Sequence, residues 1–335
     1  MLRGSLASFI PPLPPRLAPS ISFLVSATSP VYSLSTVPIP EPGVSYYAVL
    51  GHPVGHSLSP AMQQAALDAL EMPGRYVAIE LTREEFPRGI ARLGALGYAG
   101  WNVTVPHKLA MFERVDRREP SAAQAGAVNT VVRDGFHLVG HSTDGPGWES
   151  AVGASLGFTL KDRGLLILGA GGSGQTLLLH AAAAGARVFL ANRTEAKAEA
   201  LLDGFAARGI SAAYPPQKVG WEACSLAEVA ERVDLIVNTT SSGLKEGEAS
   251  PVPASVFRSG LLAYDLIYRP AVTPFLQAAA EGGARGANGL SMLLHQGFLA
   301  FRLWHPALSP AEASTALAAM RGALEAATGQ TLSPT

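Results

Sequence analysis

The sequence predicts an α/β protein with two successive α/β units and a helical C-terminal segment. Short apolar segments alternate with amphipathic ones from Tyr46 onward, which is typical of a parallel or mixed sheet covered by helices. A glycine-rich turn at residues 169–174 directly follows an apolar strand and opens the second unit in the middle of the chain. After Gly286 the apolar residues take up helical spacing. The first unit must therefore have a function separate from that of the glycine-rich turn.

Composition indicates a globular protein and narrows the classes of partner. Of the 335 residues, 48% are hydrophobic and 15% charged, which predicts about two domains with well-developed cores. A net charge of −1 argues against a nucleic-acid partner, and apolar runs are too short for a membrane span. The single cysteine, Cys224, excludes an internal disulfide and favours a reducing compartment, so we predict a cytoplasmic protein. The eight histidines lack paired metal-ligand spacing, which predicts that there is no metal site.

The N-terminal residues 1–44 differ in composition from the rest of the chain. They are rich in proline and serine, contain no acidic residue before Glu41 and lack helical periodicity, which predicts a disordered extension. An organellar transit peptide is a second interpretation, although two arginines are few for one. A start codon assigned too far upstream is a third.

The remaining residues divide into an N-terminal domain at 45–150, a central domain at 151–286 and C-terminal helices at 287–330. In the N-terminal domain we expect strands at 46–50, 76–81 and 99–103 and helices at 60–70 and 84–96. In the central domain we expect strands at 164–168, 186–191, 235–238 and 262–267.

Two helices are expected at the C-terminus. Ser309, Pro310 and Glu312 provide an N-cap, a proline at the first helical position and a capping-box glutamate for the last helix. The helix before it is expected to pack through one stripe, Leu290, Leu293, Leu294, Gly297, Phe301 and Trp304.

The glycine-rich turn has the G-x-G-x-x-G spacing that a dinucleotide requires between a strand and a helix. Gly169 permits a tight turn, Gly171 lets the backbone approach a pyrophosphate, and Gly174 lets the following helix pack closely. The helix start then offers unpaired N–H groups to the phosphates. Such turns also occur for packing reasons alone, so the residues after the next strand decide between the two interpretations.

The strand at 186–191 ends in Asn192, Arg193 and Thr194, about 20 residues past the glycines. An NAD-binding unit usually has a carboxylate there to hold the ribose 2′-hydroxyl. A guanidinium suits a 2′-phosphate instead, so the sequence predicts NADP as the cofactor. The alternative is that Arg193 is an ordinary solvated arginine.

Three segments upstream of the turn carry more polar residues than strands and loops require. Ser57 and Ser59, at the start of the expected helix 60–70, suit a carboxylate, although Ser59 before Pro60 is also a natural N-cap. Each residue of the other two segments has an ordinary alternative as a turn, cap or solvated residue. Those segments supply Asn102, Thr104 and Lys108 at the end of a buried strand, and Asn129 and Asp144 further along.

These segments, in this order and spacing, resemble the shikimate dehydrogenase family over residues 46–305. The resemblance implies a Rossmann-type NADP domain, an N-terminal substrate domain to which the C-terminal helices return, and NADPH-dependent reduction of 3-dehydroshikimate to shikimate in aromatic amino-acid biosynthesis. It implies substrate contacts by Ser57, Ser59, Thr104, Asn129, Asp144, Tyr268 and Gln296, with Lys108 at the reacting oxygen. The cofactor positions that it implies are Gly169, Ala170, Gly171, Gly172, Ser173, Asn192, Arg193, Thr194, Lys197, Leu266 and Gly289.

The reaction explains why a lysine and a carboxylate are needed together. Hydride addition to a ketone develops negative charge on oxygen, and an ammonium group supplies both charge and a proton. We therefore expect Lys108 to be the acid/base and Asp144 to orient it and tune its proton affinity.

The sequence departs from the family pattern at two positions and leaves alternatives open. Ser142 stands where the family usually has Asn, and Gln63 where it often has His, which affects local hydrogen bonds rather than the reaction class.

A quinate/shikimate dehydrogenase that uses NAD is one alternative function, and a non-catalytic NADP-binding regulator is another. We expect a monomer or a homodimer.

Overall fold

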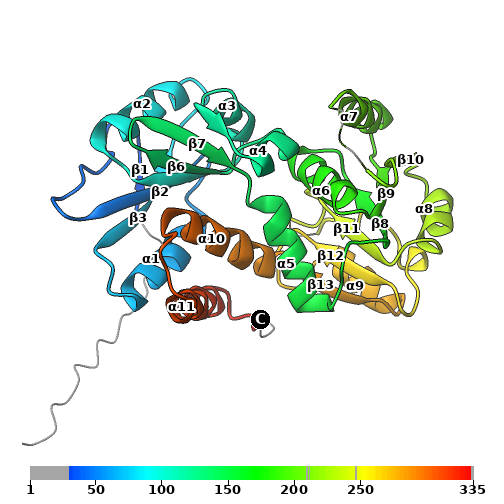
Figure 1. Ribbon diagram of the computed structural model, residues 1–335. Helices are drawn as coiled ribbons and strands as arrows, with labels where there is room; N and C mark the ends of the chain where they lie inside the picture. The colour runs from blue at the N-terminus through cyan, green and yellow to red at the C-terminus, as the bar shows by residue number, and fades with distance from the viewer. Residues whose placement is uncertain (1–29, 209, 211, 246, 333–335) are drawn as a thin grey trace, which may run out of the picture.

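Two β-sheets, each covered by helices, lie side by side in the computed structural model, which describes residues 30–208, 210, 212–245 and 247–332 (Figure 1). The first sheet has seven strands in the order β1-β3-β2-β4-β6-β7-β5, and the second has six in the order β10-β9-β8-β11-β12-β13. The predicted α/β class with two units is confirmed. None of the helices in the described part of the chain combines the length and hydropathy of a membrane span.

The first sheet is mixed. Its strands β1, β3, β2 and β4 are parallel, whereas β6 pairs antiparallel with both β4 and β7. The strands and helices expected over residues 46–103 are confirmed with small shifts of their ends, but the β6–β7 hairpin was not predicted. The strands are Val31–Tyr32 (β1), Ser45–Gly51 (β2), Gly74–Glu80 (β3), Gly100–Val103 (β4), Arg117–Arg118 (β5), Thr130–Asp134 (β6) and His137–His141 (β7). The helices are Ser59–Ala69 (α1), Phe86–Leu96 (α2), Lys108–Phe112 (α3), Pro120–Ala125 (α4) and Asp144–Leu156 (α5).

The disorder expected for residues 1–44 does not hold for the part that the structure describes. Val31 and Tyr32 pair with Ala78 and Ile79 of β3, so the chain covers an otherwise open sheet edge. Val37 is buried, and the hydroxyl of Tyr98 donates to the carbonyl of Pro38 at 3.1 Å. Residues 1–29, which carry the rest of that prediction, lie outside the described residues.

The second sheet is parallel throughout and has the doubly wound strand order of the Rossmann-type domain that the family resemblance implies. Its first strand, β8, is central, and β9 and β11 lie on either side of it. The strands are Gly164–Leu168 (β8), Arg187–Ala191 (β9), Gln217–Val219 (β10), Leu235–Asn238 (β11), Leu262–Asp265 (β12) and Arg285–Asn288 (β13). The helices are Gly172–Ala183 (α6), Glu195–Ala207 (α7), Ala223–Ala230 (α8) and Pro274–Glu281 (α9), with a 3-10 turn at Ala254–Val256.

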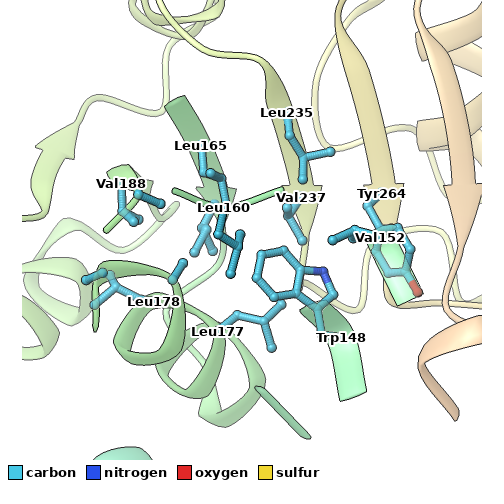
Figure 2. Close-up of a cluster of buried hydrophobic side chains, with 14 of the residues drawn as sticks. Trp148, Val152, Leu160, Leu165, Leu177, Leu178, Val188, Leu235, Val237 and Tyr264 are labelled. Carbon is cyan, nitrogen blue, oxygen red and sulfur yellow. The ribbon is translucent and has the colours of Figure 1, made fainter. Parts of the chain in front are cut away.

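Helix α5 is part of the core of the second sheet (Figure 2). Trp148 and Val152 of α5 pack with Leu177 of α6 against the buried strands β8 and β11. Since α5 begins at Asp144, one helix joins the core of the second sheet to the first sheet. The expected boundary at 150/151 falls inside this helix.

The C-terminal helices α10 (Leu290–Trp304) and α11 (Pro310–Thr328) return to the first sheet, as predicted. Phe301 of α10 and Met320 of α11 are buried in one cluster with Tyr47 of β2 and Met62 of α1. The indole of Trp304 donates to the carbonyl of Val131 in β6 at 2.9 Å. Because α10 starts beside β13 and ends on the first sheet, it is a second link between the two sheets (Figure 1).

The return of α10 predicts a large stability effect at its buried face. Phe301→Ala removes a ring that is 1% exposed and should lower the unfolding free energy by about 3–5 kcal/mol. The control is Phe136→Ala at the tip of the β6–β7 hairpin, where the ring is fully exposed and the expected change is within about 0.5 kcal/mol. Urea unfolding measures both values, and equal effects would contradict this packing.

Candidate active site

The carboxyl ends of the strands of both sheets meet at a cavity of about 460 Å³. The predicted residues after β2, β4 and β7 lie at this edge, as does Asn129, because β6 runs in the opposite direction. A ligand at such an edge is expected in parallel α/β sheets. All eight residues that the sequence assigned to substrate and catalysis line this cavity: Ser57, Ser59, Thr104, Lys108, Asn129, Asp144, Tyr268 and Gln296. Ser173, Leu266 and Gly289 line it from the second sheet.

Lys108 and Asp144 form an ion pair in the cavity wall, with 2.5 Å between Nζ and Oδ2. Their side chains are 28% and 12% exposed, so both charges are partly desolvated and each needs the other. Lys108 begins α3, and the preceding His107 anchors this helix through a contact of 2.7 Å between Nε2 and the carbonyl of Leu81. Burial lowers the pKa of His107, which favours a neutral ring stacked on Phe86. The contact of His107 therefore fixes the backbone position from which the Lys108 side chain extends.

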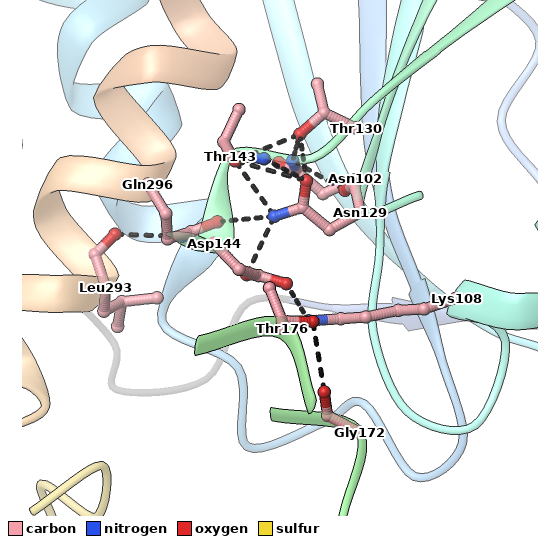
Figure 3. Close-up of polar contacts among 10 residues, drawn as sticks. All are labelled: Asn102, Lys108, Asn129, Thr130, Thr143, Asp144, Gly172, Thr176, Leu293 and Gln296. Carbon is pink, nitrogen blue, oxygen red and sulfur yellow. Dashed lines mark hydrogen bonds and ion pairs between the residues drawn. The ribbon is translucent and has the colours of Figure 1, made fainter. Parts of the chain in front are cut away.

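Asn129 orients the carboxylate of Asp144 from the other side (Figure 3). Its Nδ2 donates to Oδ1 of Asp144 at 2.9 Å and lies 3.5 Å from Oε1 of Gln296. Its Oδ1 accepts from the backbone N–H of Thr143 at 2.8 Å, which determines which end of the amide faces the carboxylate. One oxygen of Asp144 thus faces Asn129 and the other faces Lys108.

Asn102, which the sequence singled out at the end of a buried strand without assigning it a role, also lines the cavity. Its Nδ2 donates to the carbonyl of Asn129 at 3.2 Å and to the hydroxyl of Thr130 at 3.0 Å. Its Oδ1 accepts from the hydroxyl of Tyr76 at 2.7 Å. A polar residue inside the fully buried strand β4 is the sequence signal that points to it.

The two serines lie at the start of α1. Leu58, not Ser59, occupies the N-cap position, and it makes no side-chain capping bond to any described residue. The N-cap alternative for Ser59 is therefore wrong, because Ser59 is already the first helical residue. Ser57 Oγ accepts from the backbone N–H of Ser59 at 3.2 Å, which places both serines on the same helix start at the cavity wall.

Gln296 and Tyr268 reach the cavity from the C-terminal half of the chain. The Nε2 of Gln296 donates to the carbonyl of Leu293 at 2.9 Å, within α10. The backbone carbonyl of Tyr268 accepts from the side chain of Gln330 at 2.8 Å, and burial raises the pKa of the tyrosine hydroxyl. The hydroxyl thus stays a donor near neutral pH.

The glycine-rich turn has the form that a pyrophosphate requires. Gly169 has φ +108°, and β-carbons added at Gly171 and Gly172 would meet no atom within 4 Å. A β-carbon at Gly174 would instead overlap the carbonyl of Gly169, so this glycine serves close packing. Helix α6 begins here with no side-chain cap from the described residues, which leaves its first N–H groups to a ligand.

The residues after β9 lie beside this turn. The Oδ1 of Asn192 accepts from the backbone N–H of Ala170 at 3.0 Å, which joins the two segments. Arg193, Thr194 and Lys197 are exposed, and neither cation forms an ion pair with a described residue. The turn and these side chains fit NADP, since a phosphate group is favoured by two exposed cations close to the turn.

The two departures from the family pattern are buried beside the site rather than in it. The backbone N–H of Ser142 donates to Oγ of Ser121 at 3.1 Å, and the Nε2 of Gln63 donates to the carbonyl of Gly297 at 2.9 Å. Neither residue lines the cavity.

Asp265 lies at the end of β12, just before the cavity-lining Leu266. It accepts from the side chain of Asn238 at 3.0 Å, the hydroxyl of Thr273 at 2.6 Å and the backbone N–H of Ile267 at 3.0 Å. These bonds join the loops that follow β11 and β12. Burial raises the pKa of Asp265 to about 6, against the lowering effect of its hydrogen bonds.

Comparison with known proteins agrees with this geometry. Residues 49–131 match the model of the shikimate dehydrogenase substrate binding domain. A curated relative from Geobacter metallireducens, named shikimate dehydrogenase (NADP(+)), is 39% identical over 257 residues, which cover 76% of this chain and 89% of the relative. The chain belongs to the shikimate dehydrogenase family.

Solved structures of the family have the same architecture. The crystal structure of shikimate 5-dehydrogenase from Thermus thermophilus in complex with NADP(H) and shikimate matches with a TM-score of 0.72 and 39% identity, over 83% of this chain and 99% of that one. Quinate dehydrogenase from Corynebacterium glutamicum in complex with NAD matches with a TM-score of 0.72 and 27% identity, over 82% of this chain and 99% of that one. The fold therefore accompanies more than one named activity.

The raised pKa of Asp265 predicts a pH-dependent stability. The folded state binds a proton more tightly than the unfolded chain, so stability is lost as pH rises from about 4 to about 6. The unfolding free energy of the wild type minus that of Asp265→Asn should fall by up to about 3 kcal/mol over this range. Urea unfolding at pH 4 and pH 7 measures it. The exposed Asp134→Asn is the control, and a constant difference for Asp265→Asn would contradict the prediction.

Proposed function

We propose that this protein catalyses the reversible NADPH-dependent reduction of 3-dehydroshikimate to shikimate. The observation that carries the proposal is the Lys108–Asp144 ion pair in a cavity shared by the serine-bearing helix start and the dinucleotide-type sheet. A cavity of about 460 Å³ suits a small polyhydroxylated ring beside the reacting end of a cofactor. Membership of the family supports the same activity.

In the mechanism that we propose, Lys108 is the general acid/base. When bound, NADPH supplies the hydride that reduces the ring carbonyl carbon. Negative charge then develops on the carbonyl oxygen, and Lys108 Nζ stabilises it and donates the proton that completes the hydroxyl. In the reverse direction the lysine accepts that proton. Asp144 keeps Nζ in place and, through its contact with Asn129, stays in one orientation.

The other cavity residues would bind the substrate. Ser57 and Ser59 would hold the carboxylate through their hydroxyls, since both line the cavity at the start of α1. Thr104, Asn129, Tyr268 and Gln296 would bind ring hydroxyls as neutral hydrogen-bonding groups. These neutral side chains bind the substrate without burying a charged side chain besides the Lys108–Asp144 pair.

The cofactor site is assigned to the second sheet. The backbone of residues 169–173 would hold the pyrophosphate at the N-terminus of α6, with Asn192 supporting the turn. Arg193, Thr194 and Lys197 would bind the 2′-phosphate. Leu266 and Gly289, which line the cavity, would contact the nicotinamide end.

We further propose a cytoplasmic protein that is a monomer or a homodimer. The single cysteine, which is exposed, supports a reducing compartment. We assign residues 45–150 to substrate binding, 151–286 to NADP binding and 287–330 to the returning helices, with α5 crossing the first of these boundaries. Light scattering after size exclusion tests the oligomeric state.

Assays of each substrate with each cofactor test the proposed activity directly. Shikimate and quinate are each assayed with NADP and with NAD by absorbance at 340 nm, and shikimate with NADP should have the highest kcat/KM. Equal rates with NAD would contradict the role given to Arg193. No turnover of shikimate would favour a non-catalytic binding protein.

Removal of the lysine amine should remove most of the turnover. Lys108→Ala is expected to lower kcat by about 100-fold or more with little change in KM, because the ammonium acts on charge that develops only during the reaction. Lys161→Ala, an exposed position before β8, is the matched control. A folded Lys108→Ala protein with nearly normal kcat would exclude this role.

Removal of the guanidinium after β9 should reduce discrimination between the two cofactors. Arg193→Ala is expected to raise the KM for NADP about tenfold or more and leave the KM for NAD nearly unchanged, because only NADP carries the 2′-phosphate. Arg187→Ala, at the opposite end of β9, is the control. Parallel changes for both cofactors would contradict the assignment.

A further inference from the structure

Tyr76 lies behind the cavity wall and is connected to the ion pair by a chain of buried hydrogen bonds. It belongs to β3, is 5% exposed and does not line the cavity. We propose that Tyr76 is a positioning residue that holds the Asn102 amide in place and, through it, supports the network that ends at Asp144. This inference rests on the proposed dehydrogenase function, which assigns the network to catalysis.

Every bond in the chain has a defined direction when it is followed from Tyr76. The tyrosine hydroxyl donates to Oδ1 of Asn102 at 2.7 Å, so the amide turns its Nδ2 toward Thr130 at 3.0 Å. Thr130 Oγ1 thus accepts one hydrogen bond, and its own hydroxyl donates to Oδ1 of Asn129 at 3.0 Å. This leaves Nδ2 of Asn129 to donate to Asp144. The direction of the first bond is thus consistent with that of the last.

Tyr76 is the donor in its bond to Asn102, because the other end of that amide, Nδ2, faces the backbone carbonyl of Asn129, which can only accept. Burial raises the pKa of its hydroxyl well above the usual value of 10, so the proton stays on the oxygen. The ring is also held in place. It packs at 6.0 Å from the ring of Trp304, which itself donates to Val131, while the backbone N–H of Tyr76 donates to the side chain of Gln64 at 3.1 Å.

Loss of the hydroxyl leaves a buried acceptor without its donor. In Tyr76→Phe, Oδ1 of Asn102 loses its bond, and a buried unpaired oxygen favours rotation of the amide or entry of water. Either change weakens the bonds to Thr130 and to the carbonyl of Asn129. The serines at α1 and the residues at β9 are untouched, so the contacts to the substrate carboxylate and to the cofactor should change little.

The kinetic test compares Tyr76→Phe with Tyr98→Phe. Tyr98 is also buried and donates to one backbone carbonyl, that of Pro38, but it is not part of the network. We expect kcat for shikimate oxidation to fall about tenfold in Tyr76→Phe, with the KM values for shikimate and NADP within about threefold of wild type. A kcat within twofold of that of Tyr98→Phe would overturn the inference.

A double-mutant cycle tests whether Tyr76 acts through Asn102. In an Asn102→Ala background the effect of Tyr76→Phe should disappear, because the bond that it removes is already absent. An undiminished effect in that background would overturn the inference. If Tyr76→Phe does not fold, the kcat of Asn102→Ala is the test. A wild-type kcat in that variant would show that the hydrogen bonds of Asn102 do not support catalysis, and would refute the inference.

A readout without turnover separates this inference from the proposed function. The side-chain amide resonances of Asn102 and Asn129 in ¹⁵N-edited spectra should move in Tyr76→Phe and stay in place in Tyr98→Phe. Absence of shikimate oxidation by the wild type would refute the proposed function, whereas unmoved amide resonances would refute the link from Tyr76 to the network. The two failures are therefore distinguishable.

Discussion

The ion pair between Lys108 and Asp144 is the constraint on which the rest of the site depends. Two charges 2.5 Å apart and mostly withdrawn from solvent are costly unless they are paired and their remaining hydrogen-bonding capacity is satisfied. The amide of Asn129 satisfies the second oxygen of the carboxylate, and the backbone of Thr143 orients that amide. Polar groups are present in this buried region because the pair requires them.

The topology brings the pair to the point where both sheets end. The antiparallel β6–β7 hairpin returns the chain to the edge at which β2 and β4 end, so residues 15 positions apart in the chain, Asn129 and Asp144, come into contact. Helix α5 then starts at Asp144 and runs into the core of the second sheet. Helix α10 runs in the reverse direction and carries Gln296 to the same cavity. The position of the Asp144 carboxylate therefore depends on the packing of both domains.

The sequence predicted local features well because local rules govern them. The glycine-rich turn, the arginine after β9 and the capping box at Ser309 depend on residues only a few positions apart, and the structure has the turn and the capping box in the expected form. The family resemblance added the grouping of the distant site residues. Residues 30–32 were missed because their order depends on a strand edge more than 40 residues away. Tyr76 was missed for a similar reason, since a tyrosine in a strand looks like an ordinary core residue until its hydroxyl partner on β4 is known.

A crystal structure with shikimate and NADP bound would test the central claim most directly. We predict that the ring hydroxyl to be oxidised lies within hydrogen-bonding distance of both Lys108 Nζ and the carboxylate of Asp144, while the substrate carboxylate lies on Ser57 and Ser59. We also predict the 2′-phosphate beside Arg193. A substrate bound in the reverse orientation, with its carboxylate on Lys108, would contradict the account, because the lysine would then be a binding cation rather than the acid/base.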